Sequence, residues 1–314
     1  MSKLNIPELN KVVLDSLDFF SLNQPPKLNT KNFSFGFIVG SGNAYNAAKI
    51  IFGDQKALYA NESNFTDLLK NYQALIKDKV LKEAVIISAS GEKDAVWEIK
   101  AAKKAGLKTT LLTCEPDSTG AKLADNVLPF RKIAEPYTYN FSTYFGMIIS
   151  KSGEKAFNIK KELSRVETSL KTNLKTKANF RKYKSFAFVL PDKYEAIAEM
   201  INIKREELFG PFLSLRAFSE GQARHAKFVH PSKDELVISF SENKYFGLAK
   251  NRLETNLNKN AGPGLILALS YYLIGLIQTA KPPYFKKDIE NYCKITGAIA
   301  YKGKNKFSVI VPGN

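Results

Sequence analysis

The most constraining feature of the sequence is a regular alternation of short apolar runs and helical patterns between residues 33 and 130. Strands that alternate with helices at this spacing form βαβ units, in which the strands are parallel and covered on both faces. The sequence therefore predicts a doubly wound α/β domain, with a ligand crevice at the carboxyl ends of its strands. Five strands are expected, at residues 33–39, 56–60, 84–87, 107–113 and 127–130.

A less regular version of this pattern follows in the second half of the chain. A length of 314 residues suits two domains of about 150 residues each. We therefore expect two doubly wound parallel-sheet domains in tandem, and within the second a helix at 245–257. The expected divisions are an N-terminal lead-in at 1–32, a first domain at 33–154, a Lys-rich helical linker at 155–184 and a second, divergent domain at 185–314.

Two small, polar turns follow expected strands of the first domain, and each precedes a helix. Such turns expose backbone N–H groups, and the helix N-terminus adds partial positive charge, so the pair suits a phosphate group. Serine before a helix is also common for capping alone, but the placement of both turns at one sheet edge favours phosphate. The candidate phosphate-binding residues are Gly40, Ser41, Gly42, Asn43, Ser88, Ser90, Gly91 and Lys93.

Composition and charge limit the binding partners and the cellular compartment that we expect for this protein. The net charge of +17 invites a nucleic-acid interpretation, but the lysines are scattered along the chain, and we expect no nucleic-acid partner. Cys114 and Cys293 have no redox or metal-ligand spacing, and the N-terminus lacks a signal-peptide pattern, so we expect a cytoplasmic protein. The apolar run at 265–277 is too short to cross a bilayer and predicts a core helix, so no membrane partner is expected.

Three segments of the first domain together resemble the sugar isomerase (SIS) domain family. They are VIISASGEKDAVWEIKAAKKAG, then LLTCEPDSTGAKLADNVL, and the earlier GSGNAYNAAK. The resemblance implies a flavodoxin-like SIS fold in which the turn after the third strand binds the phosphate of a phosphosugar. Two positions depart from the family pattern, because Ala44 and Lys93 stand where hydroxyl residues are usual.

The second half is similar to the second SIS domain of tandem proteins. These include the isomerase half of glucosamine-6-phosphate synthase and the archaeal-type phosphoglucose/phosphomannose isomerases. The matching stretch is EMINIKREELFGPFLSLRAFSEGQARH. The resemblance implies a base glutamate at Glu206, with Glu207 the adjacent alternative, a histidine at His225, and a lysine at Lys294 that assists ring opening. Glu135, near the sheet edge where a sugar would sit, is a further candidate carboxylate.

The predicted function is aldose–ketose isomerisation of a phosphorylated sugar. A carboxylate would move a proton between neighbouring carbons through an enediol, and the imidazole of His225 would shuttle protons to the ring oxygen. No cofactor is expected, and His225 and His230 give no metal-ligand pattern. Alternatives are a non-catalytic phosphosugar-binding or regulatory protein, a sugar-phosphate deglycase or deaminase, and, on charge alone, a nucleic-acid-binding protein. The family resemblance also implies a homodimer, in which a second subunit supplies the histidine.

Overall fold

The structure, a computed structural model, describes residues 5–174, 180–258, 260–300 and 306–314. The chain divides into two compact units, and each is composed of segments far apart in the sequence. Unit 1 comprises Met1–Leu22, Glu135–Phe141 and Glu154–Val311, and unit 2 comprises Asn23–Ala134, Ser142–Gly153 and Pro312–Asn314.

Unit 2 contains a five-stranded parallel sheet with the strand order β2-β1-β3-β4-β5. This order confirms the doubly wound, flavodoxin-like prediction. The strands are β1 (Gly36–Gly40), β2 (Leu58–Ala60), β3 (Glu83–Ile87), β4 (Lys108–Thr113) and β5 (Asn126–Pro129). The helices are α2 (Asn43–Phe52), α3 (Phe65–Asn71), α4 (Gln73–Lys77), α5 (Asp94–Lys104), α6 (Thr119–Leu123) and most of α7 (Phe141–Ser152).

Burial explains why these short strands form in the middle of the sheet. Every residue of β1 and of β3 is buried, as expected for parallel strands covered on both faces. The helix α5 presents Ala95, Ile99 and Ala102 to the sheet at helical spacing. This core positions the loops at the carboxyl ends of β1 and β3, where the ligand crevice of such a sheet is expected.

Unit 1 contains a four-stranded parallel sheet with the order β10-β9-β7-β8. In chain order this is the arrangement of the first four strands of unit 2, so the prediction of two related sheets is confirmed. The expected helix at 245–257 is wrong: the chain there forms a short 3₁₀ helix and a strand that pairs with β9. The strands are β7 (Ser185–Leu190), β8 (Ser214–Ser219), β9 (Glu235–Ser239) and β10 (Arg252–Glu254).

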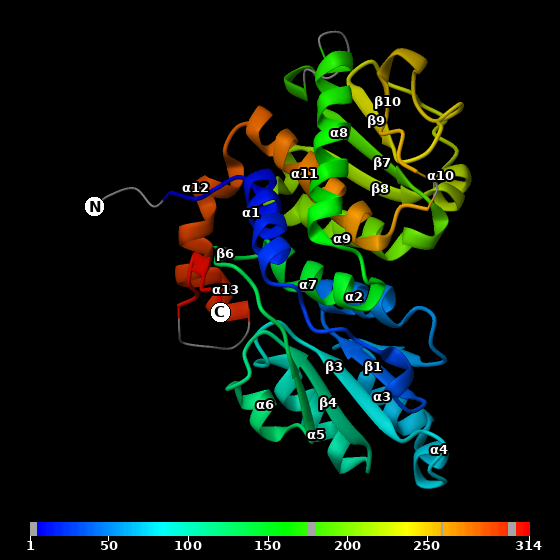
Figure 1. Ribbon diagram of the computed structural model, residues 1–314, viewed down its shortest axis with the longest axis vertical. Coiled ribbons are helices and arrows are strands. Elements are labelled where there is room, and N and C mark those ends of the chain that lie inside the picture. The colour runs from blue at the N-terminus through cyan, green and yellow to red at the C-terminus, as the bar shows by residue number, and fades with distance from the viewer. Residues whose placement is uncertain (1–4, 175–179, 259, 301–305) are drawn as a thin grey trace. The chain divides into compact units, whose positions relative to one another are not determined.

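Three helices of unit 1, α1 (Leu9–Leu22), α8 (Ala156–Leu174) and α11 (Pro263–Ala280), pack against one another (Figure 1). The lead-in and linker segments of the sequence thus contribute integral helices to this unit. The helix α11 is long and apolar enough to cross a membrane, but 78% of that apolar stretch is buried inside the protein. It is therefore the core helix predicted from the sequence.

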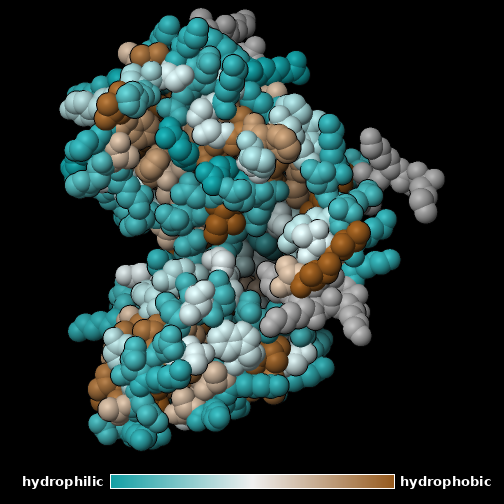
Figure 2. Space-filling view, turned by 180° about the vertical axis from the view of Figure 1, so that it is seen from behind, coloured by the Kyte–Doolittle hydropathy of each residue, from teal (hydrophilic) through white to brown (hydrophobic). Residues whose placement is uncertain are grey.

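The surface is predominantly hydrophilic in the view of Figure 2, with hydrophobic side chains in small groups. Exposed large hydrophobic residues occur on both units, among them Leu75 and Val80 in unit 2 and Tyr245 in unit 1. Scattered apolar residues of this kind are normal on soluble domains and do not by themselves mark an interface.

Candidate functional site

The candidate ligand site of unit 2 is formed by two turns that follow neighbouring strands. The strand β1 ends at Gly40 and β3 ends at Ile87, and these two residues are register partners across the sheet. Strand order reverses between β1 and β3, which is where a doubly wound sheet opens a crevice for ligands. We call residues 40–43 and 88–94 the paired turns. The prediction that they share one sheet edge is confirmed.

The paired turns have the same backbone conformation at the residue before each helix. Gly42 precedes α2 with φ 55° and ψ −123°, and Lys93 precedes α5 with φ 55° and ψ −117°. This region favours glycine, so a lysine in it stores strain of about 1–3 kcal/mol. Partial desolvation also lowers the pKa of the Lys93 ammonium. Two different sequences thus bring two helix N-termini to the crevice with the same geometry.

The serines of the second turn are oriented by the turn itself. Ser88 Oγ accepts a hydrogen bond from the N–H of Gly91 at 3.1 Å, and Ser90 Oγ accepts one from the N–H of Glu92 at 3.3 Å. A hydroxyl that accepts in this way still has its own proton to donate. Ser88 is half-buried and Ser90 is exposed. Both hydroxyls are therefore held in place while they remain able to donate to an anion.

The first turn contains a buried polar atom whose hydrogen bonding is incomplete. Asn43 is 7% exposed, and its Oδ1 has no hydrogen-bond partner among the residues that the structure describes. A buried polar atom without a partner is costly and calls for an explanation. This atom is an acceptor, so its missing partner would be a hydroxyl or N–H donor and not the oxygens of a phosphate group.

Gly91 is fixed in the second turn by a close neighbour. Its φ is +61°, and a Cβ built on it would lie 2.1 Å from Ser118 Oγ. Its carbonyl accepts a hydrogen bond from the N–H of Gly120 at 2.8 Å. Ser118 in turn caps α6, because its side chain accepts from the N–H of Ala121. The Ser118 segment, part of the family resemblance, therefore supports the turn from behind.

Asp125, from the same segment, holds two strands of the sheet together. Its carboxylate accepts hydrogen bonds from the N–H and the hydroxyl of Thr109 and pairs with Lys103 at 2.7 Å. These interactions, the Lys103 hydrogen bond first, lower the pKa of Asp125 to about 2. Asp125 therefore stabilises the sheet of unit 2 and does not face the paired turns as a ligand-binding residue.

Glu98 is a buried carboxyl group beside the paired turns that the sequence did not single out. It lies on α5 among the residues that face the sheet and is 1% exposed. Its Oε1 is 3.2 Å from Ser41 Oγ in the first turn. Burial raises the pKa of Glu98 to about 7, and the Ser41 hydrogen bond offsets part of that rise. The available signal was an acidic residue on the apolar stripe of a helix.

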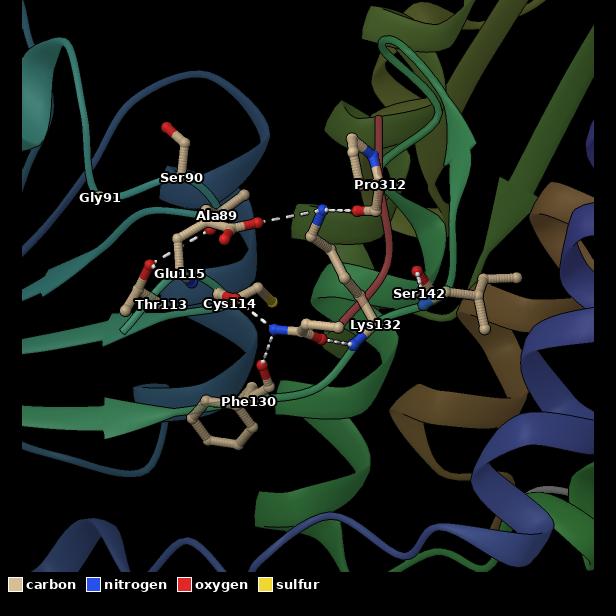
Figure 3. A network of polar contacts seen from close by, with 12 residues as sticks. Ala89, Ser90, Gly91, Thr113, Cys114, Glu115, Phe130, Lys132, Ser142 and Pro312 are labelled. Carbon is tan, nitrogen blue, oxygen red and sulfur yellow. Dashed lines mark hydrogen bonds and ion pairs between the residues drawn. The ribbon is translucent and has the colours of Figure 1, made fainter. Parts of the chain in front are cut away.

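A network of polar contacts closes the same sheet edge beyond β4 and β5 (Figure 3). The Asn314 side chain donates to the carbonyls of Cys114 and Phe130, and its Oδ1 accepts from the N–H of Lys132 at 2.8 Å. The buried Lys132 ammonium donates to the carbonyl of Pro312 and lies 3.5 Å from Glu115. We call residues 312–314 the strap.

Short contacts tie the base of the second turn to β4 in the same view. The N–H of Cys114 donates to the carbonyl of Ala89 at 3.0 Å, and the Thr113 hydroxyl donates to the same carbonyl at 3.2 Å (Figure 3). The strap therefore holds the chain that supports the second turn, because it bonds to Cys114 itself.

In unit 1 the two candidate catalytic glutamates lie on α9 (Glu195–Leu208). Glu206 is exposed and pairs with the neighbouring Arg205. Glu207 is 21% exposed and pairs with Lys204, whose side chain is fully buried. Burial raises the pKa of Glu207, and the Lys204 ion pair offsets part of that rise. The structure thus separates the two neighbouring glutamates into a surface carboxylate and a mostly buried one.

The loop before α7 contacts the ammonium group of Lys204. The carbonyl of Thr138 accepts a hydrogen bond from Lys204 Nζ, which also lies 5.6 Å from the centre of the Tyr271 ring. Thr138 has φ +76°, a strained conformation for a β-branched residue, and its Oγ1 is buried without a hydrogen-bond partner in the described part of the chain. Strain of this kind concentrates at functional sites.

The remaining predicted residues of unit 1 do not join this cluster. Glu135 is buried and accepts a hydrogen bond from the N–H of Phe141 at 2.9 Å, so it orders the loop. His225 is exposed near the end of α10 (Glu220–Ala226), and Lys294 is exposed in the π-helix at Tyr292–Thr296. Within the described residues there is no group of three or more His, Cys, Asp or Glu placed to hold a metal ion.

The fold is that of solved phosphosugar proteins. Glucosamine-6-phosphate deaminase from Thermotoga maritima matches with a TM-score of 0.55 at 14% identity, over 87% of this chain and 92% of that chain. The C-terminal domain of glucosamine-fructose-6-phosphate aminotransferase from Francisella tularensis gives 0.53 at 14% identity, over 89% and 94%. Tagatose-6-phosphate ketose/aldose isomerase from Escherichia coli gives 0.51 at 13% identity, over 88% and 89%.

These comparisons confirm the tandem SIS-type fold that the sequence segments resembled. No family model and no curated protein matches the sequence. Because a shared fold at this level of identity does not carry a reaction with it, the function has to be argued from the residues.

Proposed function

We propose that the protein binds a phosphorylated sugar and acts as an aldose–ketose isomerase. The observation that carries the proposal is the pair of turns between β1 and β3, where the strand order reverses. Two helix N-termini and the Ser88 and Ser90 hydroxyls lie in these turns, and such groups suit an anion. Binding energy from the phosphate group would hold the sugar in place for the chemistry at its other end. No redox cofactor is needed for this reaction, because one carbon of the sugar is oxidised while its neighbour is reduced and the balance closes within one molecule.

We assign the proton transfer to Glu207. A base that removes a proton next to a carbonyl works best when its pKa lies near the operating pH, and burial moves the pKa of Glu207 in that direction. The fully buried Lys204 pairs with the Glu207 carboxylate and holds it in place. Glu206 is instead exposed and pairs with Arg205 at the surface.

The test is turnover of a panel of hexose and aminohexose 6-phosphates by the parent chain and two matched variants. Glu207→Gln keeps the size of the side chain and removes the base, so turnover should fall by about 10²- to 10⁴-fold while sugar phosphate binding persists. Glu206→Gln, one residue away, should change turnover less than about twofold. The reverse pattern would assign the base to Glu206, and turnover that survives both changes would remove α9 from the mechanism.

A second candidate function is non-catalytic binding of a sugar phosphate. The exposure of both His225 and Lys294 favours it, because neither side chain is held in a buried polar site. Binding of the panel by the parent chain without turnover of any member would support this reading. Release of ammonia or of an amine from an aminated sugar phosphate would instead support a deaminase or deglycase.

We also propose that the protein is a cytoplasmic homodimer. An exposed His225 is available to a second copy of the chain, as the family resemblance implies. Cys114 and Cys293 are both buried, and neither is in a disulfide within the described residues, as a reducing compartment allows. Light scattering at micromolar concentration should give twice the 35.1 kDa of one chain. A mass of one chain would contradict the dimer.

A further inference from the structure

Glu98 reaches the paired turns from the buried side of α5. Its carboxyl group is one turn of helix beyond Asp94, the first residue of α5, and it contacts Ser41 in the turn after β1. It therefore joins the second helix of the site to the first turn of the site. An ordinary core position on this helix would be apolar, as Ala95, Ile99 and Ala102 are.

The charges around Glu98 do not neutralise it. The carboxylates of Asp94, on the same helix, and Glu62, in the loop before α3, both act on it, and both oppose its ionisation. From the helices packed on α5, the charged residues are the mutually paired Asp67 and Lys70 of α3 and the exposed Lys122 of α6. Within the second turn, the cationic residue is Lys93, at the N-cap of α5.

The protonation state of Glu98 decides what Ser41 can offer a ligand. As a carboxylate, Glu98 accepts the hydroxyl proton of Ser41, and Ser41 then presents only lone pairs to the crevice. As a neutral acid, Glu98 donates its own proton to Ser41 Oγ, and Ser41 is free to donate to an anion. The charged form also places a negative charge beside the bound anion, which costs further binding energy.

We infer that Glu98 is a positioning residue that controls the phosphate site of unit 2. The site binds anions when the Glu98 carboxyl group is protonated, so that anion binding takes up a proton. The inference rests on the proposed function, because it assumes that the paired turns hold the phosphate group. It makes Ser41 a conditional donor and leaves Ser88 and Ser90 as donors at any pH.

Sulfate is the probe that tests this inference, because it keeps the same charge between about pH 6 and pH 8, whereas phosphate monoesters titrate there. With a Glu98 pKa of about 7, the binding-competent fraction falls by about tenfold across that range, and the sulfate affinity should fall by the same factor. Calorimetry of the full chain at constant ionic strength would measure the affinity. Repeating it near pH 7 in buffers of different ionisation enthalpy should show the uptake of about half a proton.

Glu98→Gln separates this role from a purely structural one. Its amide can donate to Ser41 Oγ at every pH, so sulfate should bind at pH 8 as tightly as it binds the parent at pH 6, without proton uptake. Glu62→Gln, which changes an exposed carboxylate nearby, should keep the pH dependence. Sulfate binding by the parent that does not vary with pH would overturn the inference and leave the phosphate site standing. Sulfate and sugar phosphates that fail to bind at any pH would overturn both.

Discussion

The two sheets of this protein share a topology but present opposite chemistry at their carboxyl edges. In unit 2, β1 and β3 end in turns of glycine and serine that leave donors for a ligand. In unit 1, the corresponding edge after β7 and β9 is occupied by the chain's own acids. Asp192 accepts from the N–H of Gly221 at 2.6 Å, and Glu254 accepts from the N–H of Asn243 at 3.0 Å.

Two further carboxylates of unit 1 complete this pattern. Glu195 accepts a hydrogen bond from the Gln222 side chain at 2.8 Å, and Glu220 accepts one from the Ser241 hydroxyl. After β7, unit 1 has no positive-φ residue like Gly42 or Lys93, because Pro191 leads directly into a short 3₁₀ helix at Asp192–Tyr194. Under the proposed function, the same fold would bind an anion at one edge and exclude one at the other according to a few side chains.

The largest expected difference between the two edges concerns glycine. In Gly91→Ala the new Cβ would meet Ser118 Oγ at 2.1 Å with a φ of +61°, so the free energy of unfolding should fall by about 3 kcal/mol. Gly221→Ala, at the edge of unit 1, places a Cβ 3.1 Å from the exposed Asp192 carboxylate and should change stability by less than about 1 kcal/mol. Urea unfolding of both variants measures the contrast, and equal losses would contradict it.

Substitution of the buried Glu98 should change the free energy of unfolding by a smaller amount, and this change depends on pH. The pKa of Glu98 is raised from its ordinary 4.5 to about 7, so the folded state holds this proton more tightly than the unfolded chain does. The stability that this provides is complete below about pH 4.5 and is lost as pH rises through about 7. Glu98→Gln should therefore raise the free energy of unfolding at pH 8 by about 2 kcal/mol, with little effect at pH 4.5.

The matched change in unit 1 should have the opposite sign. Asp192→Asn weakens a charge-assisted hydrogen bond to the N–H of Gly221 and should lower the free energy of unfolding at pH 8 by about 1 kcal/mol or less, since Asp192 is exposed. Thermal or urea unfolding at the two pH values measures both variants. If Glu98→Gln destabilised the protein at pH 8, the burial account of Glu98 would be wrong.

A similarly small effect on stability is expected for the strap. Asn314→Ala removes the side-chain hydrogen bonds to Cys114, Phe130 and Lys132, and it should cost about 1 kcal/mol because the residue is exposed. Sulfate affinity should fall by less than about threefold, since the strap supports the second turn without facing its hydroxyls. A loss of sulfate binding without a loss of stability would place the strap in the site itself.

The local pattern was enough to predict the five-stranded parallel sheet of unit 2, because the alternation of strands and helices can be followed in adjacent residues. The paired turns were found in this way. The strap was not, because Asn314 contacts Lys132 across 182 positions and a single polar residue carries no periodic signal. The helix expected at 245–257 failed because Gly247 adopts φ +74° and the chain then joins a sheet edge.

The two candidate catalytic carboxylates show a different limit of prediction from sequence. Glu206 and Glu207 are adjacent in the sequence, but neighbours on a helix point about 100° apart. One therefore faces solvent beside Arg205 and the other faces the buried Lys204. Only packing separates such neighbours, and the sequence offered no way to choose. Glu98 was missed for a related reason, since an acid in a charged helix suggests a solvent-exposed face unless its neighbours on that face are known to be buried.

Hydrogen exchange of the full chain with and without glucosamine 6-phosphate or fructose 6-phosphate tests the central claim most directly. The account predicts that bound sugar phosphate slows exchange at residues 40–46 and 88–96, and that the same sugar without its phosphate does not. Slowed exchange at residues 190–195 and 240–246 of unit 1, with none at the paired turns, would contradict it.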